Sequence, residues 1–307
     1  MSPEALQLRM SVFSDFDWSW RGVHVRETGA DIVFSKALAW DVLRGGYYIF
    51  REWLRRPASA LPLNVAYEPR APRPWYLLWG ALRQAGITRN EEPADVIIHF
   101  SDLTHLETPA PTGLTLNGGC TDISKSHVAR TFETIFGYGL SLDPAKADTP
   151  YLEKGEENGV HDAQIRISPR TSEPGRVYQK LLDNKTGDGT VLDYRCPTVF
   201  GGLPLVFLKE RPIDQRFANL NTRVRLARPE DCFSAEELSQ IKRFCAAMQL
   251  DWGGLDILRH AEDGRIYIVD VNKTDMGPPL ALPIQDKLSA VKTLGQTLRA
   301  ALLERAI

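Results

Sequence analysis

Residues 264–279 read GRIYIVDVNKTDMGPP, and this stretch decides the fold. It begins as an apolar strand pattern, yet Asp270 and Asn272 interrupt that pattern two positions apart. Because side chains alternate between the two faces of a strand, strict alternation places both polar groups on the same face as Ile268. This pattern predicts either a ligand site or a strand that simply ends at the solvent edge.

A second apolar strand, WGGLDILRH at 252–260, precedes this stretch and carries one carboxylate, Asp256. We expect a three-residue loop of Glu262, Asp263 and Gly264, with Gly264 in the left-handed conformation. That register puts Asp256 directly opposite Asp270, with Cβ atoms about 5 Å apart. A two-residue loop would instead put the two carboxylates on opposite faces.

Two facing carboxylates repel each other unless a cation lies between them. Together with the amide oxygen of Asn272, Asp256 and Asp270 form a set of hard oxygen ligands. Such ligands suit Mg²⁺ or Mn²⁺, which proteins usually bind through a few carboxylates plus substrate phosphates. The three residues are therefore candidate metal ligands.

The composition is that of an ordinary globular protein of two or three lobes, with 307 residues and a net charge of −2. Acids and bases are interspersed, so a nucleic-acid partner is not expected. The four cysteines lack zinc or disulfide spacing. Neither a targeting segment nor a run of about 18 apolar residues occurs, which predicts a cytoplasmic protein without membrane association.

The first sixty residues are rich in aromatic side chains. The stretch 35–56 has helical periodicity in both halves, interrupted at Gly45 and Gly46. Its aromatic residues suit a core element, a dimer surface or a substrate wall, and core packing is the favoured interpretation. A strand, helix, strand order then predicts a small α/β lobe with a parallel sheet over 1–112.

The remainder, 113–307, combines short strands with amphipathic helices and is expected to be α+β. Ser234 and Glu237 form a capping box at the start of one helix. The last helix carries Val291, Leu294 and Leu298 on one face.

The order of these motifs resembles the ATP-grasp superfamily, in particular its glutamate-ligase-like and glutathione-synthetase-like branch. Members carry an acid on one strand and E-x-N on the next, which here are Asp256 and the DVN of 270–272. The resemblance covers roughly residues 113–305. It implies an α+β ATP-grasp fold whose two lobes, 113–180 and 181–307, clasp ATP, preceded by the small α/β N-terminal lobe on the substrate side.

The resemblance also implies roles for residues that precede the DVN motif. Lys125 and Lys154 are expected to bind the phosphates of ATP. The segment between the lobes is expected to read the adenine; its residues are Tyr178, Gln179, Lys180, Leu181 and Leu182. Arg195, with Lys209 and Arg211, is expected to be catalytic by stabilising the reacting phosphoryl group. Asn221 is a weaker substrate candidate.

Each of these residues also has a purely structural interpretation. The lysines suit a solvated surface, and Arg195 suits a buried ion pair with Asp193 or Glu210. The chain departs from the family pattern in two places. Asp270 is one methylene shorter than the family's glutamate, and the expected phosphate loop GEENGVHD, 155–162, has only two glycines and carries extra acids.

The resemblance implies an ATP- and Mg²⁺-dependent ligase that activates a small-molecule or peptide carboxylate as an acylphosphate for attack by an amine or thiol. No Walker motif or kinase glycine-rich loop is present, so other common routes to ATP are not indicated. Two alternatives remain: a phosphotransferase acting on a hydroxyl, and a nucleotide-binding module without catalysis. A homodimer is also left open.

Overall fold

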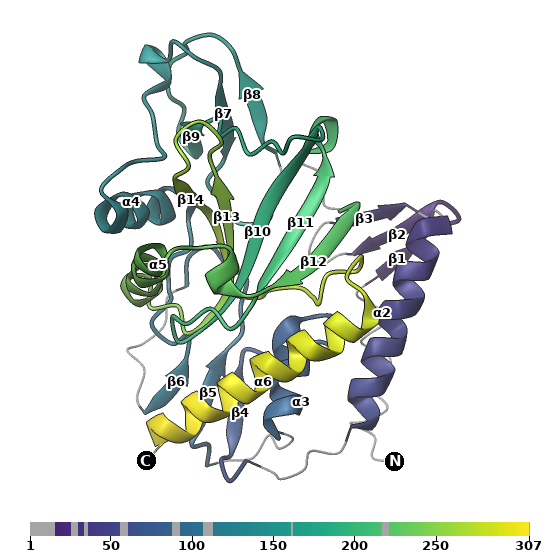
Figure 1. Cartoon of the computed structure of the whole chain (residues 1–307). Coiled ribbons are helices and arrows are strands. Elements are labelled where there is room, and N and C mark those ends of the chain that lie inside the picture. Colours follow the sequence, from purple (N-terminus) through teal and green to yellow (C-terminus); the bar gives the residue numbers. More distant parts are fainter. Residues whose placement is uncertain are drawn as a thin grey trace.

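A computed structural model of the chain describes residues 16–25, 30–33, 36–55, 61–87, 93–106, 113–160, 162–216 and 221–306. The expected boundary near residue 112 lies outside these residues, so the division into lobes stays a prediction. Helices and strands are mixed throughout, which confirms the α+β class (Figure 1).

The largest sheet has five antiparallel strands in the order β12-β11-β10-β13-β14. Their bounds are β10 Thr190–Val199, β11 Val206–Pro212, β12 Arg223–Ala227, β13 Trp252–Arg259 and β14 Ile266–Asn272. Helices α4 (Lys125–Phe136) and α5 (Ala235–Ala247) lie together beside β13 and β14 (Figure 1). The predicted capping box of Ser234 and Glu237 is present at the start of α5.

A smaller sheet, β8-β7-β9, stands at the end of the molecule above α4 in Figure 1. Its strands are β7 Tyr151–Gly155, β8 Gln164–Arg166 and β9 Arg176–Lys180, all antiparallel. Strand β7 pairs with both neighbours and is therefore the central strand of this sheet.

The predicted parallel α/β unit is confirmed. Strands β4 (Val65–Glu68), β5 (Val96–His99) and β6 (Leu114–Leu116) form a parallel sheet, with α3 (Leu77–Ala85) between the first two in sequence. The last helix, α6 (Ile284–Ala306), packs against α3. One hydrophobic core joins this unit to the five-stranded sheet, because Trp252 and Phe207 belong to the same cluster as Leu294 and Leu298.

The N-terminal segment forms the fourth sheet of the described residues and a long helix. Strands β1 (Phe16–Trp18), β2 (Gly22–Val25) and β3 (Ala30–Val33) are antiparallel, and α2 spans Lys36–Leu54. The expected interruption of α2 at Gly45 and Gly46 is wrong, because the helix continues through both glycines. A Cβ at position 45 would lie 3.3 Å from Leu280 Cδ2, so this glycine allows close packing.

Core packing of the aromatic residues near the N-terminus is also wrong for most of those whose side chains are described. Tyr48 is buried, at 2% exposure. The others are exposed, namely Trp20, Trp40, Tyr47, Phe50 and Trp53. The error arose because aromatic content alone does not say which face of a helix meets the core.

No helix among the residues described is long and apolar enough to cross a membrane.

Candidate active site

The hairpin of β13 and β14 brings the two predicted carboxylates face to face. Asp256 and Asp270 are register partners, as expected. The loop that achieves this is not the predicted one. It has four residues, 261–264, and is closed by a 2.9 Å hydrogen bond from the His260 amide to the Arg265 carbonyl. Gly264 does adopt a positive φ of 70°, as predicted.

A β-bulge corrects the register between the loop and the carboxylates. Ile257 pairs with Ile268, whereas Asp256 pairs with Asp270, so β14 contains one additional residue between the two pairs. Strict alternation is therefore wrong at this point: Ile268 faces away from Asp270. The bulge allows Ile268 to stay fully buried in the core while Asp270 points to the other face.

Arg195 extends this row of charges across a third strand. It is the register partner of Asp256 on β10, and its Nη1 donates to Asp256 Oδ2 at 2.8 Å. Its Nε and Nη2 donate to Asp275 Oδ1 at 3.0 and 2.6 Å. The predicted structural partners of Arg195 were wrong, because Asp193 pairs instead with Arg211, and Glu210 pairs with Arg225.

Asp275 is a site residue that sequence reasoning missed. It follows β14 by three residues, in a loop where an aspartate usually indicates only a turn. Here its side chain is 1% exposed, and its Oδ2 has no hydrogen-bond partner. Gly254 makes room for this arrangement, because a Cβ there would lie 2.7 Å from Arg195 Nε and would also strike Asp275 Oδ2. The signal available in the sequence was a further acid five residues after Asp270.

The three charges shift one another's pKa values. Burial opposes the charge on Arg195, but Asp256 and Asp275 outweigh it and raise the pKa of Arg195. Burial likewise opposes ionisation of Asp256, yet Arg195 and Lys209 lower the pKa of Asp256 overall. Burial is decisive for Asp275 and raises its pKa. Because its pKa is lowered, Asp256 is better suited than Asp275 to bind a cation as a carboxylate.

Lys154 approaches the acidic pair from β7. Its Nζ donates to the Val269 carbonyl at 3.2 Å, next to Asp270. Burial lowers the pKa of Lys154 to about 8, and Asp270 is the strongest opposing charge. Lys125 and Asp256 also act on Lys154 electrostatically, which places four predicted site residues in one neighbourhood.

Lys209 and Arg211 lie on β11, on the side of Arg195 away from β14. Both are charge neighbours of Asp256. Arg211 is 6% exposed and forms an ion pair with Asp193. The predicted catalytic cations therefore lie on one face of the five-stranded sheet, beside the acidic pair.

In the loop 155–162, which is expected to cover the phosphates, residues 156–158 are hydrogen-bonded to two neighbouring segments of the chain. Glu156 Oε1 accepts from the amide and the hydroxyl of Ser126 at 3.0 and 2.6 Å, at the start of α4. Lys125 Nζ donates to the Glu157 carbonyl at 2.5 Å. The Asn158 amide donates to Thr104 Oγ1 at 2.8 Å, in the N-terminal α/β unit. The carboxylate of Glu156 thus has a structural partner, whereas Glu157 is held through its backbone carbonyl and is exposed.

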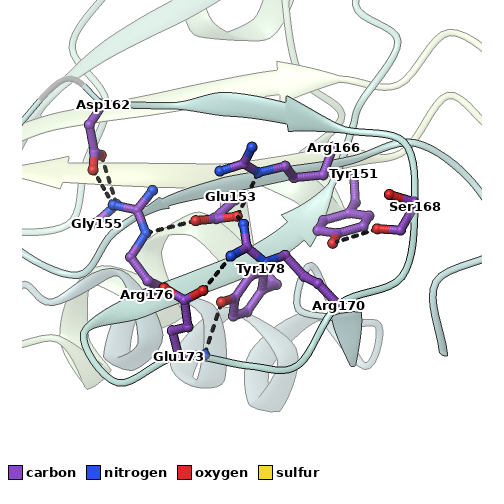
Figure 2. A network of polar contacts seen from close by, with 10 residues as sticks. All are labelled: Tyr151, Glu153, Gly155, Asp162, Arg166, Ser168, Arg170, Glu173, Arg176 and Tyr178. Carbon is purple, nitrogen blue, oxygen red and sulfur yellow. Dashed lines mark hydrogen bonds and ion pairs between the residues drawn. The ribbon is translucent and has the colours of Figure 1, made fainter. Parts of the chain in front are cut away.

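Figure 2 shows the polar contacts that surround Glu153 in the sheet β8-β7-β9, whose central strand also carries Lys154. Glu153, whose side chain is 4% exposed, accepts from Arg166, Arg170 and Arg176 at 2.7, 2.8 and 3.1 Å. The hydrogen bond from Arg166 is the main cause that lowers the pKa of Glu153. Because neighbouring residues of a strand face opposite sides, anchoring Glu153 directs Lys154 toward Asp270.

The segment 178–182 is partly engaged within the protein. Tyr178 and Gln179 are buried in β9, and Lys180 is exposed. The Lys180 amide donates to the Leu140 carbonyl at 2.9 Å, and the Leu182 carbonyl accepts from Arg216 at 2.8 Å. Leu181 lies between these two engaged peptide groups. The adenine-reading role of this segment stays a prediction.

Asn221 lies where the chain enters β12. Its Oδ1 is buried without a hydrogen-bond partner. The next residue, Thr222, bonds through its amide to the Glu210 carbonyl at 3.0 Å, so Asn221 is near the end of β11 that carries Arg211. An unpartnered amide oxygen beside Arg211 suits a substrate contact, which stays a prediction.

The residues present fit a divalent cation bound together with phosphates. Among the residues described, no group of three or more His, Cys, Asp or Glu side chains is arranged to hold a metal by itself. The candidate set has two facing carboxylates and the amide of Asn272, which is the register partner of Gly254 on the same face. Asp256 Oδ1 is buried and unpartnered. One or two carboxylates plus phosphate oxygens is the usual coordination of Mg²⁺.

A cavity of about 340 Å³ opens beside this site. Its walls come from the residues after the carboxyl ends of β4 and β5 and from the loop after β14: Pro69, Arg70, Phe100, Ser101, Asp102, Leu103, Tyr76 and Thr274. Ligands bind at the carboxyl ends of parallel strands in open α/β sheets. Two backbone hydrogen bonds connect the segment around Tyr76, in the cavity wall, to the loop that carries Asp275. The Leu77 amide donates to the Asp275 carbonyl at 2.9 Å, and the Gly277 amide donates to the Trp75 carbonyl at 2.9 Å.

Comparisons with known proteins bear on the fold. Neither protein-family models nor curated proteins gave a match. Among solved structures, the ATP-grasp ligase PsnB complexed with precursor peptide PsnA2 and AMPPNP aligns with a TM-score of 0.50 and 12% identity, covering 79% of this chain and 97% of that chain.

Two further structures align less well. PsnB complexed with minimal precursor has a TM-score of 0.44 and 16% identity over 64% of each chain, so this chain spans less than two thirds of that relative. The macrocyclase MdnC bound with precursor peptide MdnA, from Microcystis aeruginosa MRC, has a TM-score of 0.44 and 10% identity, covering 78% and 98%. The alignment over nearly all of PsnB, with the strand order of the central sheet, leads to one conclusion: this chain has the ATP-grasp fold.

Proposed function

We propose that this protein is an ATP- and Mg²⁺-dependent ligase that activates a carboxylate as an acylphosphate for attack by an amine or thiol. The observation that carries the proposal is the convergence of Asp256, Asp270, Arg195 and Lys154 from four different strands. A fold needs no such concentration of partly buried charge for stability, because buried ion pairs stabilise little beyond apolar packing.

In this proposal the chain's own residues hold and neutralise a triphosphate. Lys154 and Lys125 bind phosphate oxygens as point charges, while Arg195 offers a planar donor pair. Asp256, Asp270 and Asn272 would hold Mg²⁺, which would neutralise negative charge on the phosphates. Loop 155–162 excludes water from the phosphates, because its residues Glu156 and Asn158 are hydrogen-bonded to Ser126 in α4 and to Thr104.

The proposed reaction has two displacements. A carboxylate oxygen of the acceptor attacks the γ-phosphorus of ATP, and ADP leaves. The amine or thiol then attacks the carbonyl carbon, and inorganic phosphate leaves. Arg195, Lys209 and Arg211 stabilise negative charge on the transferred group in both steps, and no nucleophilic side chain of the protein is required.

The cavity beside β4 and β5 is the proposed site of the acceptor. Tyr76, Phe100 and Leu103 give it apolar walls, while Arg70 and Asp102 bring one positive and one negative charge. Because Thr274 lines the same cavity two residues beyond Asn272, an acceptor bound there is next to the proposed metal site. PsnB, which shares the fold, was complexed with a precursor peptide, so a peptide carboxylate is the first acceptor class to test.

Hydroxylamine trapping tests this proposal. The protein is incubated with ATP, Mg²⁺, hydroxylamine and panels of amino acids, peptides and alcohols, and ADP and hydroxamate are measured together. A carboxylate-dependent hydroxamate supports the acylphosphate route. ADP release that depends on an alcohol and yields no hydroxamate would instead identify a phosphotransferase, and ATP binding without turnover on any panel would indicate a module without catalysis.

A further inference from the structure

Helix α2 exposes a continuous apolar stripe that the proposed function does not use. We name as the α2 seam the residues Trp40, Leu43, Tyr47, Phe50 and Leu54, whose exposed fractions are 66, 63, 49, 53 and 55%. Their spacing alternates between three and four residues. Side chains at such spacing form one narrow line along a helix.

The opposite face of α2 is fixed to the rest of the protein. Tyr48 and Glu52 are buried, and Glu52 accepts from Gln84 Nε2 at 2.7 Å. Arg83 donates to the carbonyls of Glu52 and Trp53 at 2.5 and 2.7 Å, at the end of the helix. These contacts fix the rotation of α2 about its axis, so the seam residues stay exposed. Helix α2 itself lies at the edge of the molecule in Figure 1.

Polar side chains border the seam without interrupting it. Arg44 donates to Asp41 at 3.0 Å within the helix. Arg51 donates to the hydroxyl of Tyr47 at 3.2 Å and lies 5.9 Å from the centre of its ring. A polar border beside an apolar centre is typical of a protein interface, and here Arg44 and Arg51 form that border along one side of the seam.

The exposed area is large enough for a stable contact between two proteins. Aromatic side chains bury about 150–250 Å² each when covered, and those of the seam are about half to two-thirds exposed. With Val42 and Trp53, which flank the seam at 47 and 56% exposure, the patch amounts to about 600–700 Å². Standard interfaces take about 600–1,000 Å² from each partner, so this patch is at the lower end of that range. It also exceeds the largest apolar patch of a typical monomer, which is about 300–600 Å².

We infer that a second copy of this chain covers the α2 seam, helix against helix, in a two-fold symmetric dimer. The seam is self-complementary, because Tyr47 lies midway between its ends at Trp40 and Leu54. Two copies that meet at Tyr47 therefore match stripe to stripe in either helix orientation, as a two-fold contact requires.

The test uses the full chain with two seam residues changed together, Leu43→Glu and Phe50→Glu. Both side chains are more than half exposed in one copy, so the monomer is expected to keep its fold. Ile167→Glu, at a residue that is 83% exposed and outside α2, is the matched control. Sedimentation equilibrium should show a dimer for the wild type and the control, and a dissociation constant at least about 100-fold weaker for the seam variant.

A cross-linking measurement gives an independent readout. Tyr47→Cys places a thiol at the centre of the proposed contact, so oxidation should give a covalent dimer that the wild type with its four native cysteines does not give. A monomeric wild type at about 100 μM, or a dimer that the seam variant leaves unchanged, would overturn the inference. So would a monomer that sediments with anionic phospholipid vesicles, because a membrane would then be the occupant. Since α2 contributes no residue to the proposed active site, loss of ligase activity would not affect this result.

Discussion

Replacing Arg195 by methionine should strongly destabilise the protein, because this residue holds two carboxylates together inside it. The side chain is 12% exposed, and it donates three hydrogen bonds, of 2.6, 2.8 and 3.0 Å, to Asp256 and Asp275. Asp275 is 1% exposed, so it would remain as a buried charge with no cation beside it, or take up a proton. Breaking a buried pair in this way costs about 3–5 kcal/mol.

A matched surface pair provides the control. Arg228 binds Asp231 through two hydrogen bonds of 2.9 and 2.8 Å, but the two side chains are 78 and 53% exposed. Arg228→Met should therefore leave stability unchanged, because water replaces the lost contacts. Unfolding by urea, followed by circular dichroism, compares the two variants with the wild type. If Arg195→Met loses no more stability than Arg228→Met, the reasoning about the buried triad is refuted.

Three further predictions concern the surroundings of this triad. In the folded protein burial lowers the pKa of Lys154 from 10.5 to about 8, so Lys154 keeps its proton to a higher pH in the unfolded chain than in the folded one. Unfolding free energy should therefore rise from pH 8 to 10.5 by about 3 kcal/mol more in the wild type than in Lys154→Met; equal pH profiles would contradict this. Gly254→Ala should lower stability by about 1–3 kcal/mol through collision with Arg195, whereas Gly187→Ala, which has open space, should not. Glu153→Gln should increase amide exchange in 151–180, because it removes the charge shared by three arginines; unchanged exchange would show that this cluster does not hold the sheet.

The acidic pair shows what a local pattern can and cannot predict. Apolar alternation and a glycine-containing turn were sufficient to place Asp256 opposite Asp270. They did not predict the four-residue loop or the bulge before Asp270. The loop shifts the register of the hairpin, and the bulge shifts it back, so Asp256 still pairs with Asp270. A bulge depends on contacts made by both faces of the strand, and these are not visible in the strand's own sequence.

Asp275 and Glu153 were missed for a different reason. Each is buried only because a distant segment covers it: Arg195 lies 80 residues before Asp275, and the partners of Glu153 come from β8, β9 and their connection. From the sequence alone, no role was assigned to either residue. The charge balance of a buried cluster follows from tertiary packing and not from local spacing.

The exposed face of α2 was wrongly assigned to the core because the helix carries apolar residues on two faces. One set of residues, with Tyr48 and Glu52, packs against the protein, and another set, with Tyr47 and Phe50, faces solvent. A helix apolar on most of its circumference usually lies in a core. The tertiary structure shows that α3 and α6 pack against one side of α2, and only this packing determines which apolar residues of α2 remain exposed.

Binding of Mn²⁺ in the presence of AMPPNP, followed by electron paramagnetic resonance, tests the central claim most directly. The wild type should bind one Mn²⁺ whose free signal disappears only when the nucleotide analogue is added. Asp270→Ala should lose this nucleotide-dependent binding, whereas Asp263→Ala, in the exposed loop of the same hairpin, should retain it. Unchanged Mn²⁺ binding in Asp270→Ala would contradict the assignment of the acidic pair as the metal half of an ATP site.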